Sequence, residues 1–193
     1  MAENWNGPPI GYFAEIIPVQ RVAARSDVAV VVLVEVRCYR QGILFELVAA
    51  TARTHPTMDN EADQFIHTIS PPMSQEEPRD EFLRFYVSGP GITASSADAV
   101  RFRRQAMAPG DGEFVLNPVA GRGRFGPTVF EYRQPLWLSP LPPPQPFDLV
   151  TEWPAHGIAD SRFTLDGQYL VRAAENSSSF WPMSPPDEPG VEE

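Results

Sequence analysis

The sequence from Asp27 to Tyr39 reads DVAVVVLVEVRCY, and it predicts the central strand of a β-sheet. Valine occupies every second position from Val28 to Val36, and Cys38 continues the row, so one face of this strand is apolar throughout. The other face turns polar after Leu33. This pattern predicts burial on both sides at the start of the strand and on one side at its end.

A tight turn, Arg40-Gln41-Gly42, separates this strand from a second one that runs from Ile43 to Thr54. The second strand alternates, and its inward side chains are Ile43, Phe45, Leu47 and Ala49. Two such strands joined by a short turn that contains glycine predict a β-hairpin.

Short stretches rich in valine, isoleucine, phenylalanine and tyrosine recur along the chain, and 22 prolines and 13 glycines separate them. Further strands are predicted at Ala14–Ala24, Glu81–Ser88, Thr128–Leu138, Phe147–Trp153 and Arg162–Leu165. Pro18 marks the first of these as an edge strand or a bulge. A helix is predicted after Asp166-Gly167, where Tyr169, Leu170, Ala173 and Ala174 have helical spacing. We therefore predict an all-β protein, an antiparallel β-sandwich with long Pro/Gly-rich loops and one short C-terminal helix.

The length of 193 residues suits one domain. The predicted parts are an N-terminal arm (1–13), a single sandwich domain (14–181) that includes a long acidic loop (55–80) and a Gly/Arg loop (108–127), and an acidic Pro-rich tail (182–193). We expect the tail to be disordered because it has few apolar side chains to offset the entropy of ordering. Within the acidic loop, residues 59–69 allow a helical turn. Residues 95–107 fit either a helix or a strand.

The charge balance restricts the partners. The chain carries 15 arginines, no lysine and 25 acidic residues, which gives a net charge of −10. Such a chain lacks the cationic surface that nucleic acid requires, and anionic membranes would repel it. The single cysteine, Cys38, allows no internal disulfide, and the N-terminal segment does not resemble a secretory signal. We expect a soluble, cytoplasmic protein that binds a protein partner, with the oligomeric state open.

The stretch Leu136–Pro146, LWLSPLPPPQP, leads into Thr151–Ile158, TEWPAHGI. This block resembles one in a family of uncharacterised actinobacterial proteins, in which a WPLPPP-type linker joins a strand to an EWP-x-x-GI turn, a short strand and a C-terminal helix. The segment Ile17–Asp27 is similar to the start of that family. Ser139 departs from its pattern, which usually has a second aromatic residue there. The resemblance implies the order of these elements and no function.

The prolines Pro142–Pro144 favour polyproline II, a stiff spacer that would carry the chain from one sheet to the other. The alternative is that they bind an aromatic groove on another protein. Three tryptophans are expected in the core or at its edge: Trp137, Trp153 and Trp181.

Motifs for catalysis and metal binding are weak in this sequence. Cys38 on the apolar face of a strand indicates a buried thiol, and no histidine among His55, His67 and His156 has a second ligand at metal spacing. The segment Asp59–Asp63 imitates the start of a calcium-binding EF-hand loop, but Gln64 stands where the loop needs glycine and Ser70 where it needs glutamate. We expect no cofactor and no metal site.

Arginines form the candidate site. Six arginines and three acidic residues lie between Arg101 and Arg133, a local charge of +3. The segment Gly121–Gly126, GRGRFG, matches G-x-G-x-x-G, but Pro127 and a β-like stretch follow it, so the dinucleotide-binding context is missing and we expect a flexible loop. The candidate residues for binding an anion or an acidic partner are Arg101, Arg103, Arg104, Arg122 and Arg124. The structural alternative is that they pair with acidic side chains elsewhere on the surface.

Two functions remain open at this point. The first is a non-enzymatic binding or structural accessory protein that acts through protein–protein contacts. The second is a hydrolase-type or metal-assisted enzyme whose site contains acidic residues of the 55–80 loop, with Asp59, Glu61 and Asp63 as the candidates.

Overall fold

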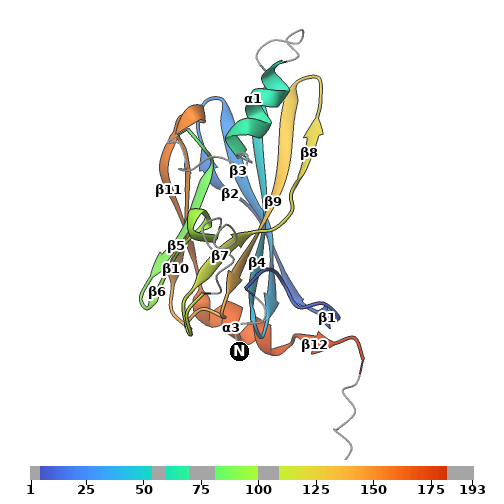
Figure 1. Ribbon diagram of the computed structural model, residues 1–193, viewed down its shortest axis with the longest axis vertical. Coiled ribbons are helices and arrows are strands. Elements are labelled where there is room, and N and C mark those ends of the chain that lie inside the picture. Colours follow the sequence, from blue (N-terminus) through green and yellow to red (C-terminus); the bar gives the residue numbers. More distant parts are fainter. Residues whose placement is uncertain (1–4, 54–59, 70–80, 100–108, 182–193) are drawn as a thin grey trace, which may run out of the picture.

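Two antiparallel β-sheets pack face to face in the computed structural model, which describes residues 5–53, 60–69, 81–99 and 109–181 (Figure 1). Buried side chains from both sheets form one apolar core between them, with Leu33 and Phe45 from the first sheet and Leu149 and Trp153 from the second. The predicted antiparallel β-sandwich is confirmed.

The larger sheet has the strand order β2-β3-β4-β9-β7, and β8 also pairs with β9. Its strands are β2 (Glu15–Arg25), β3 (Ala29–Tyr39), β4 (Gly42–Ala52), β7 (Val115–Pro118), β8 (Arg122–Phe125) and β9 (Val129–Ser139). The predicted β3–β4 hairpin is present, and all four predicted inward side chains of β4 are buried. β2 is an edge strand with bulges, as Pro18 predicted.

The smaller sheet has the strand order β11-β10-β5-β6. Its strands are β5 (Arg84–Gly89), β6 (Ile92–Ser95), β10 (Phe147–Trp153) and β11 (Ile158–Leu165). A 3-10 turn, η1 (Pro154–His156), connects β10 to β11, which is longer than the predicted strand. The chain passes between the two sheets through residues 140–146, so the proline run is a crossover segment, as its polyproline propensity predicted.

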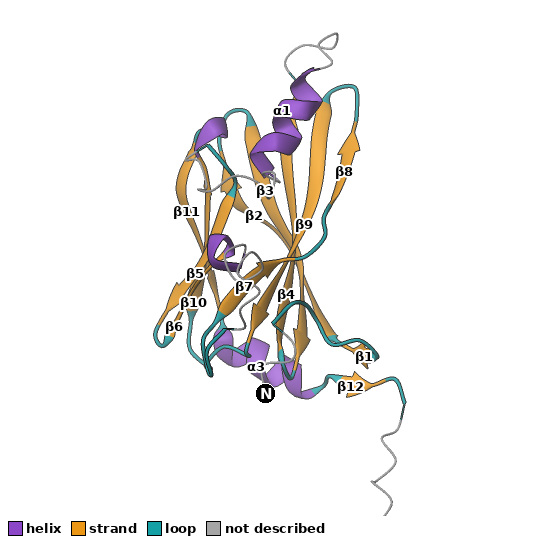
Figure 2. Cartoon of the chain, in the orientation of Figure 1, coloured by secondary structure: helices purple, strands orange, loops and turns teal. Residues whose placement is uncertain are grey.

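Helices close the two ends of the sandwich (Figure 2). α1 (Asn60–Ile69) inserts Phe65 into the core, where its ring lies 5.8 Å from that of Phe130 and 6.0 Å from that of Trp153. α3 (Gly167–Glu175) begins at Asp166, whose side chain accepts a hydrogen bond from the backbone N–H of Tyr169. This N-cap satisfies one of the free donors at the start of the helix.

The alternation of buried and exposed side chains along β3 differs from the prediction in the first half of the strand. Ala29, Val31 and Leu33 face the core, whereas Val36 and Cys38 do so after an irregularity between Leu33 and Glu35. A β-bulge places one extra residue in β3 at this point, and an extra residue reverses which side faces inward. The predicted burial on both sides at the start of the strand is therefore only half right, because Ala29, Val31 and Leu33 are buried there, whereas Val28 is exposed and Val30 and Val32 are partly exposed.

Other predictions need correction. The segment 108–127 is not a continuous loop, because β7 and β8 lie within it and pair with β9. Trp137 and Trp153 are buried as predicted, but Trp181 is 70% exposed. The tail, residues 182–193, lies outside the described residues, as do residues 55–59 and 70–80 of the acidic loop. Residues 96–99 are helical, and residues 100–107 lie outside the described part.

A second, smaller core covers the outer face of the larger sheet near the α3 end. Trp137, Tyr39 and Leu44 are buried there, and Tyr12 and Ala14 from the N-terminal segment pack against them. Tyr12 belongs to β1 (Tyr12–Phe13), which pairs with β12 (Ser178–Ser179) in a two-stranded ribbon. The N-terminal segment therefore covers the outer face of the larger sheet at the α3 end.

Candidate functional site

Arg122 and Arg124 lie on β8, and both side chains are exposed. β8 is an edge strand whose four residues pair antiparallel with β9, so the expected flexible loop is wrong at this position. The pairing places Arg122 opposite Arg133 and Arg124 opposite Glu131. Strand pairing therefore holds the two arginines two residues apart on one face of the larger sheet.

Two glycines allow β8 to lie close to β9. A Cβ atom at Gly121 would stand 2.4 Å from Cε1 of Tyr132 and 2.5 Å from the carbonyl oxygen of Arg133. A Cβ atom at Gly123 would stand 2.9 Å from the ring of Phe125. The repeated glycines of the GRGRFG segment thus serve the packing of aromatic rings along a strand rather than the approach of a phosphate.

The strand register extends this arginine pair across the whole sheet in two parallel rows. The first row runs Val22, Val32, Val48, Arg133, Arg122, and the second runs Arg25, Val30, Ala50, Glu131, Arg124. Directly opposed residues share one face of a sheet. The intervening residues, among them Val31, Leu47 and Ala49, face the core, so both rows face outward. We call these ten residues the valine–arginine surface.

The valine–arginine surface is apolar at its centre and cationic at its borders. Val22 is 46% exposed, and Val30, Val32, Val48 and Ala50 are partly exposed. Four arginines and one glutamate give the surface a formal charge of +3 in a chain of −10. α1 packs on the inner side of the sheet through Phe65, so it does not cover these rows. An apolar area with a charged border is typical of a surface that binds another protein.

The charges of this surface are only weakly compensated among the described residues. Nε of Arg133 lies 3.9 Å from Oε1 of Glu131, a long contact between two side chains that are both solvent-accessible. Arg122 directly opposes Arg133, and like charges in opposed positions of neighbouring strands repel each other. Bringing an acidic group to this border would relieve that repulsion.

An ion cluster borders the valine–arginine surface on the side of α3. Nε of Arg37 lies 2.7 Å from Oε1 of Glu35, and Nη2 of Arg37 lies 3.7 Å from Oε1 of Glu46. Burial raises the pKa of Glu46, and the neighbouring Arg37 opposes that shift. The arginine of this cluster is thus already engaged by two carboxylates and differs from the arginines of β8.

The remaining candidate arginines, Arg101, Arg103 and Arg104, lie outside the described residues. The structure therefore brings two of the five predicted site residues together, and it adds Arg133 and Arg25 to them. The valine rows were missed in the sequence because the start of this strand is apolar on both faces, which led to the prediction that Val30 and Val32 lie in the core.

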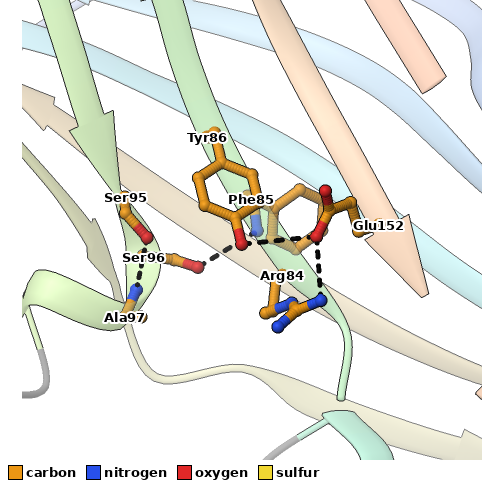
Figure 3. A network of polar contacts seen from close by, with 7 residues as sticks. All are labelled: Arg84, Phe85, Tyr86, Ser95, Ser96, Ala97 and Glu152. Atoms are coloured by element: carbon orange, nitrogen blue, oxygen red, sulfur yellow. Dashed lines mark hydrogen bonds and ion pairs between the residues drawn. The ribbon is translucent and has the colours of Figure 1, made fainter. Parts of the chain in front are cut away.

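The outer face of the smaller sheet carries a polar network (Figure 3). Oε2 of Glu152 lies 3.0 Å from Nη2 of Arg84 and accepts a hydrogen bond from the hydroxyl of Tyr86 at 3.3 Å. Behind it, the backbone N–H of Phe85 donates to Oγ of Ser96 at 3.1 Å. Burial raises the pKa of the Tyr86 phenol, so this hydroxyl stays protonated and acts as a donor. The network links opposed residues of β5 and β10 and secures their register.

Chemically reactive side chains are dispersed in the described part of the chain. Cys38 is buried, as predicted, and burial raises the pKa of its thiol to about 12. His67 is exposed on α1, His156 packs edge-on against Trp153, and burial lowers the pKa of His156. No group of three potential metal ligands occurs among the described residues.

Only one of the three candidate acidic side chains of the 55–80 loop is among the described residues. Asp63 is exposed on α1, whereas Asp59 lies outside the described residues, as does the side chain of Glu61. No described helix is both long and apolar enough to cross a membrane.

Comparisons with family models, curated proteins and solved structures found no match to this chain. The resemblance to the actinobacterial family therefore stays a prediction.

Proposed function

We propose that this protein is a non-enzymatic binding module that acts through protein–protein contacts, and that the valine–arginine surface is its binding site. The observation that carries the proposal is the pair of registered rows on the larger sheet, apolar in the middle and ending in Arg122, Arg124 and Arg133. Apolar side chains supply affinity on burial, and the arginine border selects an acidic partner and orients it.

A flat sheet face with a cationic border suits an acidic protein segment that also carries aliphatic side chains. Guanidinium groups bind carboxylates through two parallel hydrogen bonds, which makes the contact directional. A nucleic acid fits poorly, because its charge extends beyond the few arginines of the border and would meet the acidic remainder of the chain.

The first prediction tests this surface by charge removal. We expect Arg122→Ala with Arg124→Ala to weaken binding of a fluorescent peptide of alternating glutamate and valine by about tenfold, equivalent to about 1.4 kcal/mol. Added salt should weaken binding to the native chain more than to the variant, because screening acts on the charges that the variant lacks. Fluorescence anisotropy measures both effects, and thermal melts establish that the variant folds.

Arg162→Ala with Arg172→Ala provides the matched control. Both of these arginines are exposed, but Arg162 lies on β11 and Arg172 on α3, away from the valine–arginine surface. Their removal changes the net charge equally and should leave peptide affinity almost unchanged. The proposal is wrong if the native chain binds a lysine–valine peptide as tightly, or if both double variants lose affinity to the same extent.

A further inference from the structure

The β1–β12 ribbon and the residues beside it carry four exposed large apolar side chains, three of which are the most exposed of the described chain. Ile10 is 98% exposed, Trp181 70%, Phe13 60% and Phe180 47%. The Phe13 and Phe180 rings have centroids 4.4 Å apart, and those of Phe180 and Trp181 are 5.8 Å apart. The backbone N–H of Phe180 donates to the carbonyl of Gly11, which extends the pairing by one step. We call these four side chains the apolar ribbon.

Such a cluster is costly to leave in water. Burying large apolar side chains is favourable, and exposed clusters of this kind mark interaction sites. The rings are held against one another on hydrogen-bonded strands, so little side-chain freedom is lost when they are covered. The ribbon is therefore suited to act as an anchor.

The sequence after the ribbon adds charge of one sign. Residues 182–193 contain Asp187, Glu188, Glu192 and Glu193 and no basic residue, which gives a formal charge of −4 directly after Trp181. The ribbon and β8 lie toward opposite ends of the long axis of the molecule (Figure 1). One end thus presents apolar rings followed by acidic sequence, and the other presents valines bordered by arginines.

We propose that the partner of the valine–arginine surface is a second copy of this chain, which places its apolar ribbon on the valines and its acidic 182–193 sequence beside the arginines. The inference rests on the proposed function and names its partner. Apolar area meets apolar area and negative charge meets positive charge, which is the complementarity that specific contacts use. The two surfaces differ, so the contact is head-to-tail and can continue into rings or filaments.

Two complementary variants test the arrangement. In the proposed contact the ribbon is the donor and the valine–arginine surface is the acceptor. The donor variant, Phe180→Ser with Trp181→Ser, has a damaged ribbon because it lacks two exposed aromatic side chains. The acceptor variant, Arg122→Glu with Arg124→Glu, has a damaged valine–arginine surface because the charge of its border is reversed. Sedimentation velocity of the native chain should show a mass that increases between about 10 μM and about 1 mM and falls when salt is added, as for a small, charge-assisted interface. Each variant alone should remain monomeric.

A mixture of the two variants distinguishes the proposed head-to-tail contact from ribbon-to-ribbon pairing. The donor variant keeps an intact valine–arginine surface and the acceptor variant keeps an intact ribbon, so an equimolar mixture should form a one-to-one dimer and nothing larger. Circular dichroism and thermal melts establish that both variants fold. Ile66→Ser on α1 serves as a control, because Ile66 is also exposed but belongs to neither surface and should leave association unchanged.

Three outcomes would overturn the inference. The first is a native chain that stays monomeric up to about 1 mM at low salt. The second is an acceptor variant that still dimerises, which would indicate ribbon-to-ribbon pairing. The third is a mixture that does not associate. Failure in any of these ways would leave binding of the glutamate–valine peptide unaffected, so the proposed function is tested separately.

Discussion

Thr151 is a polar residue in a place that offers its hydroxyl no hydrogen bond. It points inward from β10 and is fully buried, and its Oγ1 atom has no partner among the described residues. A buried hydroxyl without a partner costs stability, because it has lost its bond to water. We expect Thr151→Val, which keeps the shape and removes the hydroxyl, to raise the free energy of unfolding by about 1 kcal/mol in denaturant titrations.

Thr164→Val is the matched control for this prediction. Its Oγ1 atom is exposed and donates to Oδ1 of Asp148 at 2.7 Å, so its removal breaks a bond and should bring no gain in stability. Equal effects of the two substitutions would mean that β-propensity, and not the buried hydroxyl, determines the change.

Cys38 shows how burial controls the reactivity of a single group. Burial raises the pKa of its thiol to about 12, so at pH 8 almost none of it is the reactive thiolate. We expect the native chain to react with a thiol reagent at pH 8 far more slowly than the same chain in denaturant, where the thiol has an ordinary pKa. Fast labelling of the folded chain would contradict the buried position of Cys38.

At the scale of elements, the pairing of β8 with β9 depends on the absence of a side chain at Gly121, directly before β8. A Cβ at Gly121 would collide with the Tyr132 ring and with a backbone oxygen of β9, and backbone cannot move aside easily. We expect Gly121→Ala to destabilise the chain by about 1–3 kcal/mol and to speed amide hydrogen exchange in β8 and the paired part of β9. Gly7→Ala, whose Cβ would meet nothing within 4 Å, should change neither measurement.

The same elements explain what the sequence could and could not predict. Alternation and turn signals were sufficient for the β3–β4 hairpin, for β10 and for α3, because these elements are long or clearly punctuated. They failed for β8, since glycine has low strand propensity and this segment is a strand through its pairing with β9. The start of β3 is apolar on both faces, so the partly exposed Val30 and Val32 were predicted to lie in the core.

For the molecule as a whole, the pattern of charge along the sequence led to the hypothesis of an acidic partner, but not to the surface that we propose for it. A local excess of arginine, with six of the 15 arginines between residues 101 and 133, favours an acidic partner, and the strand register places some of those arginines beside partly exposed valines. Neither feature alone defines a site. The surface that we propose as the site is built from five strands that are separated by up to about a hundred residues, which local sequence patterns do not encode.

The pairing of β1 with β12 has a consequence for the order in which the molecule is completed during synthesis. Tyr12 pairs with Ser179, 167 residues later, so this contact has the longest sequence separation among the described strand pairs. The β3–β4 hairpin can form as soon as its residues leave the ribosome, because local contacts form early and distant ones late. The apolar ribbon, by contrast, cannot assemble before the last strand emerges. A nascent chain that still lacks β12 therefore displays valines and arginines without the element that we propose to bind them, so two such unfinished chains cannot join through this contact.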